Sequence, residues 1–209
     1  MDAEERRQRR VELLTTVLLA VAAVATAWST YQSTLWRGEQ AADSTKATAA
    51  HIESSQASTR AGQLTQVDIA TFTQWVDADV AGNRRLAQFY RRRFRKEFRP
   101  AFAAWIATSP RTNPMAPLSP FAMRQYRVAE EVRAGRLNTA AGVHADEAGE
   151  ANQRAGNYVL ALVLFAVALF FAGMATKLRS PSKQEVLLVL GWVVFLGAAV
   201  WVATFPVTT

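Results

Sequence analysis

The sequence has few side chains of the types that carry catalysis or bind metals. Its 209 residues include no Cys and two His. Thiol nucleophiles and disulfides are therefore excluded, and a zinc site made of Cys and His is not expected. The sequence also lacks a glycine-rich phosphate-binding loop. We predict that the protein is not an enzyme and that it uses neither a cofactor nor a metal ion.

The two histidines nevertheless suggest one specific site. In an antiparallel helical hairpin whose two helices leave the membrane at the same level, position 144 lies opposite position 50, so that His51 and His144 would be neighbours. Such a pair could respond to pH or hold an adventitious metal ion. The alternative is two partly exposed histidines without a role. The acidic residues nearest to the pair are Glu53, Asp146 and Glu147.

The densest charged segment is residues 84–99. An aromatic residue recurs at every fourth position from Tyr90 to Phe102, which predicts a helix with one aromatic face. We expect this helix to begin at an N-cap, Asn83, and to kink or end at Pro100. The basic residues of the segment are Arg84, Arg85, Arg91, Arg92, Arg93, Arg95, Lys96 and Arg99.

Three interpretations of this segment remain open. The aromatic face could be the core of a helical domain, with the arginine stems lying around it. The helix could instead lie on a membrane surface and bind anionic head groups. It could also bind a polyanion or an acidic protein partner. Nucleic acid is the usual partner of a basic patch with aromatic residues, but we do not expect it, because the orientation predicted below places the segment outside the cell.

The elements that must position these residues include three membrane spans. Residues 13–36, 155–176 and 186–209 contain no Asp, Glu, Lys or Arg. A helix needs about 20 mostly apolar residues to cross a bilayer, and helices satisfy their own backbone hydrogen bonds. We therefore predict an all-α integral membrane protein with three transmembrane helices. Its predicted parts are the cytoplasmic N-terminus (1–12), transmembrane helices at 13–36, 157–176 and 186–205, an extramembrane helical domain (37–154), a short cytoplasmic loop (177–185) and a C-terminal tail (206–209).

The basic residues next to the spans predict the orientation. Cytoplasmic ends of spans carry an excess of Lys and Arg, and these residues are more numerous before the first span and between the last two than at the ends of the large domain. We expect the bacterial cytoplasmic membrane, with the N-terminus inside and the large domain outside. The residues counted are Arg6, Arg7, Arg9, Arg10, Lys177, Arg179 and Lys183 for the inner side, and Arg37, Lys46 and Arg154 for the outer side.

Small residues recur at alternating steps of three and four on both sides of the distal part of the domain, residues 82–136. This spacing is typical of a coiled coil, and it predicts an antiparallel Ala-rich stalk made of residues 37–81 and 137–156. The alternative is that Ala is simply common here and favours helix. The seam residues are Ala47, Ala50, Ser54, Ala57, Ala61 and Leu64, and then Leu137, Ala141, His144, Ala148, Ala151, Ala155 and Tyr158.

Two further stripes of small residues predict close helix contacts. Glycines spaced by seven lie roughly opposite the Ala seam of the returning helix, and we expect them to receive a helix from a second subunit or from elsewhere in the domain. The alternative is that these glycines only loosen the helix. The first span carries a stripe of small and hydroxylated residues, which suits helix packing or, as the alternative, the lining of a pore. The stripes are Gly135, Gly142, Gly149 and Gly156, and Ala22, Thr26, Ser29 and Ser33.

The end of the first span, residues 27–40, reads Ala-Trp-Ser-Thr-Tyr-Gln-Ser-Thr-Leu-Trp-Arg-Gly-Glu-Gln. It resembles a pattern in bacterial membrane-protein families of unknown function. In those families a first span ends in a Trp, Tyr-Gln, Trp series, here Trp28, Tyr31-Gln32 and Trp36, and a helical domain follows. The resemblance implies the same order of parts and no catalytic residue.

These observations predict a non-enzymatic assembly, scaffold or sensor protein of the membrane that works through helix–helix contacts. Its expected partners are the lipid bilayer and either a second copy or another membrane protein. One alternative is a homo-oligomeric ion channel lined by residues 13–36. Another is a module that binds anionic surfaces through residues 84–99. The lack of charged residues inside the spans argues against a coupled transporter.

Overall fold

The computed structural model describes residues 3–178 and 180–207. Arg179, which the orientation argument counts, and the last two residues of the predicted C-terminal tail lie outside them. All regular structure in the described residues is helical, as predicted. The elements are α1 (Ala3–Val80), α2 (Arg84–Arg93), α3 (Phe98–Ala107), the short 3-10 helix η1 (Pro120–Ala122), α4 (Ala129–Ala175) and α5 (Pro181–Val202).

Three of these helices contain segments long and apolar enough to cross a membrane. They are α1, α4 and α5, and they contain the segments that the sequence predicts as spans. The third helix ends at Val202, slightly before the predicted boundary. An all-helical protein with three such helices fits a membrane location.

The chain divides into two compact units. Unit 1 comprises Met1–Thr45 and His144–Thr209, and unit 2 comprises Lys46–Val143. The helices α1 and α4 contribute to both units, because each begins in one and ends in the other.

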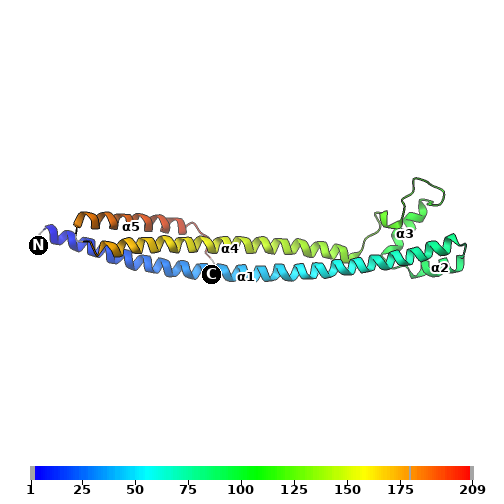
Figure 1. Cartoon of the computed structure of the whole chain (residues 1–209), viewed down its shortest axis with the longest axis horizontal. Coiled ribbons are helices and arrows are strands. Elements are labelled where there is room, and N and C mark those ends of the chain that lie inside the picture. The colour runs from blue at the N-terminus through cyan, green and yellow to red at the C-terminus, as the bar shows by residue number, and fades with distance from the viewer. Residues whose placement is uncertain (1–2, 179, 208–209) are drawn as a thin grey trace. The chain divides into compact units, whose positions relative to one another are not determined.

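In unit 1, parts of α1 and α4 lie side by side with α5 (Figure 1). Leu18 of α1, Phe165 of α4 and Phe195 of α5 are buried in one apolar cluster. Outward-facing residues of the same helices are also apolar and exposed, for example Val24, Phe170 and Val193. Exposed apolar surface is costly in water and favourable in hydrocarbon, so this surface suits a lipid environment.

In unit 2, the last part of α1 packs against α2, α3 and η1 around an aromatic core. Phe98 is fully buried, and Phe72 of α1 contacts the rings of Trp105 at 5.4 Å and Phe121 at 5.7 Å between centroids. Most ring pairs in this core meet edge to face, which is the favoured arrangement of aromatic quadrupoles. The buried members are Trp75, Ala78, Ala87, Phe94, Phe98, Phe102 and Trp105.

The expected helix over residues 84–99 is two helices, which corrects the sequence-based boundary. Asn83 caps α2 as predicted, because its side chain accepts a hydrogen bond from the Leu86 N–H at 3.1 Å. However, α2 ends at Arg93, and Pro100 lies in the first turn of α3 instead of ending a helix. The first turn is where a missing backbone N–H costs nothing.

Candidate functional site

The predicted seam positions are buried or half-buried within each unit. In unit 1 the Ser33 hydroxyl donates to the Ala155 carbonyl at 3.3 Å, and in unit 2 the Ser54 hydroxyl donates to the Ala134 carbonyl at 2.8 Å. A serine side chain reaches the backbone of a neighbouring helix only where the two helices approach closely. Small residues along the two helices allow this approach, and the Ala-rich coiled-coil stalk stays a prediction.

The glycine stripe of α4 faces open space. A Cβ atom added at Gly135, Gly142, Gly149 or Gly156 would meet no atom of the described chain within 4 Å. A helix from elsewhere in the same domain, one of the two expected occupants, is therefore not found among the described residues. Two of the expectations stay open: a second subunit as the occupant, or glycines that only loosen the helix.

The small-residue stripe of the first span faces the interior of unit 1. Ala22, Ser29 and Ser33 are buried, and the half-buried Thr26 hydroxyl donates to the Ala22 carbonyl at 2.7 Å. The stripe therefore takes part in helix packing within one copy, which was the first of the two interpretations. Exposed residues on the other side of the same helix are largely aliphatic, such as Val24.

The aromatic face of residues 84–102 is the core of unit 2, which is the first of the three interpretations. Phe94, Phe98 and Phe102 are buried, so these rings do not reach a membrane surface. The basic residues divide into two groups. Arg95 and Arg99 are tied down by hydrogen bonds. The exposed group is Arg84, Arg85, Arg91, Arg92, Arg93 and Lys96.

Arg95 belongs to a half-buried polar network around the buried Asp68, which no spacing in the sequence indicated. Its Nε donates to Asp68 Oδ1 at 3.0 Å and its Nη2 donates to Glu97 Oε2 at 2.8 Å. The Tyr126 hydroxyl donates to the other oxygen of Asp68 at 3.2 Å. Burial by itself lowers the pKa of Arg95, but the bonds to Asp68 and Glu97 outweigh it and raise that pKa.

Arg99 holds the junction between α2 and α3. Its Nε donates to the Phe94 carbonyl at 2.8 Å, and its Nη2 donates to the Arg92 carbonyl at 3.0 Å. The last carbonyls of a helix have no partner within the helix, so this side chain satisfies groups that the end of α2 leaves open. Its role is structural.

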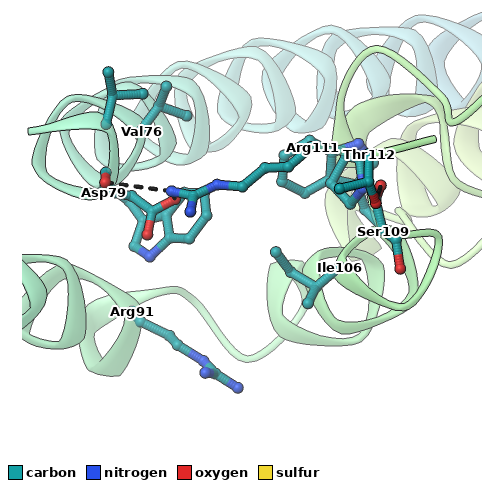
Figure 2. A pocket seen from close by; sticks show the side chains of 11 residues that line it. Val76, Asp79, Arg91, Ile106, Ser109, Arg111 and Thr112 are labelled. Atoms are coloured by element: carbon teal, nitrogen blue, oxygen red, sulfur yellow. Dashed lines mark hydrogen bonds and ion pairs between the residues drawn. The ribbon is translucent and has the colours of Figure 1, made fainter. Parts of the chain in front are cut away.

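A cavity of about 490 Å³ opens in unit 2 between the ends of α1, α2 and α3 (Figure 2). The guanidinium of Arg111 forms an ion pair with Asp79, whereas Arg91 projects from α2 apart from that pair. The sequence analysis did not anticipate this cavity, because its walls come from segments far apart in the chain. The lining residues are Trp75, Val76, Asp79, Val80, Arg91, Trp105, Ile106, Ser109, Pro110, Arg111 and Thr112.

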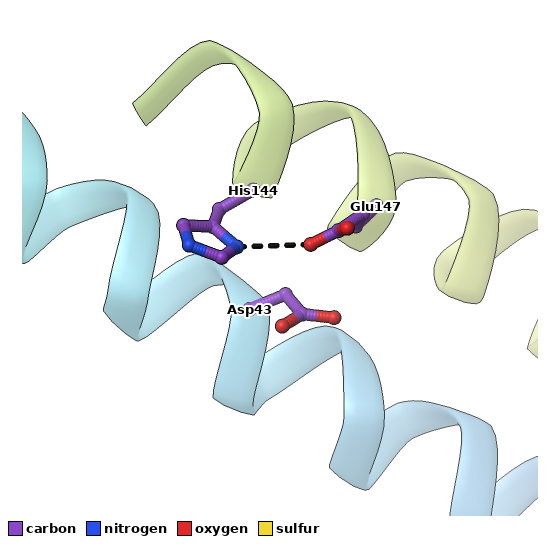
Figure 3. A group of neighbouring side chains, drawn as sticks. All are labelled: Asp43, His144 and Glu147. Carbon is purple, nitrogen blue, oxygen red and sulfur yellow. Dashed lines mark hydrogen bonds and ion pairs between the residues drawn. The ribbon is translucent and has the colours of Figure 1, made fainter. Parts of the chain in front are cut away.

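In unit 1, His144 lies beside two carboxylates (Figure 3). Its Nδ1 is 2.9 Å from Glu147 Oε2, one turn further along α4, and the buried Asp43 of α1 completes the group. One potential ligand atom from each residue lies within 4.8 Å of the other two. A nitrogen and two oxygens suit a borderline divalent cation. The sequence offered His144 and Glu147 for an adventitious site, and the structure adds Asp43 in the place expected for His51.

The neighbour of His144 corrects the predicted register. Position 144 was expected opposite position 50, but the α1 residue beside His144 is Asp43, and His51 is an exposed residue of unit 2. The Ser33 hydroxyl bonds to the Ala155 carbonyl, and counting eleven residues along each helix from that pair places position 144 opposite position 44. Taking Trp36 and Tyr158 as one level had shifted the expected pairing by six residues.

No known protein family, curated protein or solved structure matches the chain. Its class therefore follows from its own architecture. Over residues 3–178 and 180–207 the regular structure is all helical, and three of these helices are long and apolar enough to cross a membrane.

Proposed function

We propose that the chain is a non-enzymatic membrane assembly protein that pairs with a second copy through the glycine face of α4. This face is defined as Gly135, Gly142, Gly149 and Gly156. The observation that carries the proposal is that the face is open, since a Cβ at any of the four positions would meet no described atom within 4 Å.

The energetic argument starts from the cost of these glycines. Each Gly inside a helix destabilises it by about 1 kcal/mol relative to Ala. Within one copy, no contact of the described chain at these positions requires the absence of a side chain. Close approach of a second helix would offset the cost, because a smooth glycine face lets two backbones come into contact.

The geometry of membrane insertion decides how two copies would pair. Both copies enter the bilayer in one orientation, so their α4 helices run parallel, related by a two-fold axis along the membrane normal. Equal residues of the two copies then face each other. A spacing of seven keeps the contact on one face along the left-handed crossing that is usual for parallel helices.

The two alternative functions have less support. The channel interpretation depended on a polar stripe in the first span, and Ser29 and Ser33 of that stripe are buried within one copy. Binding of an anionic surface depended on an aromatic face that could enter the membrane, and Phe94 and Phe98 of that face are buried in unit 2.

The proposed location is the bacterial cytoplasmic membrane, with the N-terminus inside and unit 2 outside. The basic residues that flank the spans support this orientation. Because the chain has no Cys, one introduced Cys reports the side unambiguously. We expect Ser58→Cys to react with a membrane-impermeant maleimide in intact cells, and Gln8→Cys to react only after lysis. The reverse result would overturn the orientation.

Disulfide crosslinking tests the pairing directly. Single Cys variants at Gly135, Gly142 and Gly149, oxidised in membranes, are expected to give crosslinked dimers, because equal residues meet at the axis. The matched control is Ala140→Cys. Ala140 is also exposed on α4, but it lies on another face because two residues turn a helix by about 200°. Equal crosslinking at Gly142→Cys and Ala140→Cys, or none at the three glycine positions, would refute the pairing.

A further inference from the structure

We propose that the unit 2 cavity of Figure 2 binds a small organic anion with an apolar, ring-bearing body. This inference is independent of the pairing through α4, because it concerns side chains at the ends of α1, α2 and α3. The cavity volume of about 490 Å³ lies within the range of small-molecule sites, roughly 300–1,000 Å³.

The walls of the cavity determine the body of the ligand. Two indoles, Trp75 and Trp105, form one part of the lining, and Val76, Val80 and Ile106 supply aliphatic surface. Indole rings favour offset or edge-to-face contact with another ring. A flat apolar body therefore gains more from these walls than a hydrated polar solute does.

The charge of the lining determines the polar end of the ligand. The three charged residues of the lining are Asp79, Arg91 and Arg111. Asp79 and Arg111 neutralise each other in an ion pair, which leaves the single positive charge of Arg91. In the part of the chain that the structure describes, no carboxylate lies within ion-pair distance of Arg91, whose contact is with the Phe102 ring at 5.9 Å. One carboxylate or sulfonate would balance this charge.

Two other arginines of the same segment, Arg95 and Arg99, already have hydrogen-bond partners for their guanidinium groups. The guanidinium of Arg99 is bound to two backbone carbonyls, and that of Arg95 to Asp68 and Glu97. Both of these side chains serve the fold. Arg91 has five N–H donors in a planar fork, and it lines the cavity without such partners.

The cavity is held in shape before any ligand arrives. The Trp105 indole N–H donates to the Pro117 carbonyl at 2.7 Å, which fixes the loop after α3. The ion pair between Arg111 and Asp79 joins the same loop to α1. A preformed site loses little conformational entropy on binding.

Calorimetric titration of the full chain in neutral-lipid nanodiscs tests the proposal, with empty nanodiscs as the blank. The probe is 2-naphthoate, and its matched controls are the neutral 2-naphthamide and inorganic phosphate. We expect naphthoate to bind about ten-fold more tightly than naphthamide, as one charge-assisted hydrogen bond contributes. Phosphate is expected to bind far more weakly than either, because it has no apolar body.

The variants assign the preference to Arg91. Arg91→Gln should remove the preference for naphthoate over naphthamide, and Arg91→Lys should retain most of it. Arg85→Gln, which removes an exposed arginine of the same helix outside the cavity, should behave like the wild type. Equal binding of naphthoate and naphthamide, no binding of either, or an unchanged preference in Arg91→Gln would overturn the proposal.

Discussion

Asp68 connects three segments of unit 2 through its side chain. It is fully buried on α1, and its two oxygens accept hydrogen bonds from Arg95 and Tyr126. A buried carboxylate is costly unless it is paired and fully hydrogen-bonded. These contacts therefore bind α1 to the α2–α3 junction and to the segment before α4 through one side chain.

Tyr126 should make unit 2 less stable at alkaline pH. Burial raises its pKa above the ordinary value of 10.0, and the nearby charge of Asp68 acts in the same direction. Because the pKa of Tyr126 is higher in the folded state than in the unfolded state, the protonated phenol stabilises the folded state of unit 2. This stabilisation is fully present below about pH 10 and is lost as the pH rises through the raised pKa. We expect the thermal midpoint, followed by near-ultraviolet circular dichroism, to fall more between about pH 8 and about pH 11 in the wild type than in Tyr126→Phe.

The control for this pH dependence is Tyr90→Phe. This change removes a phenol whose hydroxyl contacts Gln74 and not Asp68, so the variant should resemble the wild type. A Tyr126→Phe variant with the same pH dependence as the wild type would contradict the role given to Tyr126.

At the residue scale, the sequence predicted the apolar partners better than the polar ones. The aromatic face is visible as a spacing of four, and Phe94 and Phe98 are buried as its first interpretation requires. Asp68 gives no such signal. It is one of several acidic residues in α1, and its partners Arg95 and Tyr126 lie 27 and 58 residues away along the chain.

At the scale of elements, Gly191 of α5 is the glycine with the tightest surroundings in the described chain. A Cβ there would lie 3.1 Å from a methyl carbon of Leu18 and 3.3 Å from the Ala168 carbonyl oxygen. The backbone oxygen cannot move aside without shifting α4. Gly191 therefore sets the distance between α5 and the other two helices.

Gly191→Leu should destabilise unit 1 by overpacking, at a cost of about 1–3 kcal/mol. The matched control is Gly197→Leu in the same helix, because a Cβ at Gly197 would meet no atom within 4 Å. The midpoint of thermal aggregation in detergent measures the difference. We expect a clear decrease for Gly191→Leu and no decrease for Gly197→Leu. Equal midpoints for the two variants would show that the contact at Gly191 does not determine the packing of α5.

The existence of the three long helices could be predicted from the sequence. The register of α1 against α4 and the break between α2 and α3 could not. The three apolar runs lie in α1, α4 and α5 as expected. The predicted register assumed that Trp36 and Tyr158 mark one level, but the hydrogen bond from the Ser33 hydroxyl to the Ala155 carbonyl sets a register shifted by six residues. Aromatic residues mark a membrane interface only within a turn or two of helix. The break before α3 depends on bonds made by Arg99, which spacing does not reveal.

At the scale of the whole molecule, the proposed function depends on the pairing of two copies through α4. Within one copy, small residues at the seams are buried, and the glycine face of α4 is open. Small residues thus differ in their surroundings: the Ala seam of α4 is buried within one copy, whereas its glycines are open. If the open face is a contact between copies, the functional unit is a dimer.

Native mass spectrometry of the chain released from nanodiscs tests whether two copies form a dimer through α4. The account predicts a dimer for the wild type and a monomer for the Gly142→Leu/Gly149→Leu variant, because two bulky side chains keep the α4 helices apart. Leu has a higher helix propensity than Gly, so loss of the dimer could not be attributed to a weaker helix. The control Ala140→Leu should remain dimeric. A monomeric wild type, or a Leu variant that stays dimeric, would contradict the account, and a closed assembly of four or more copies would favour the channel instead.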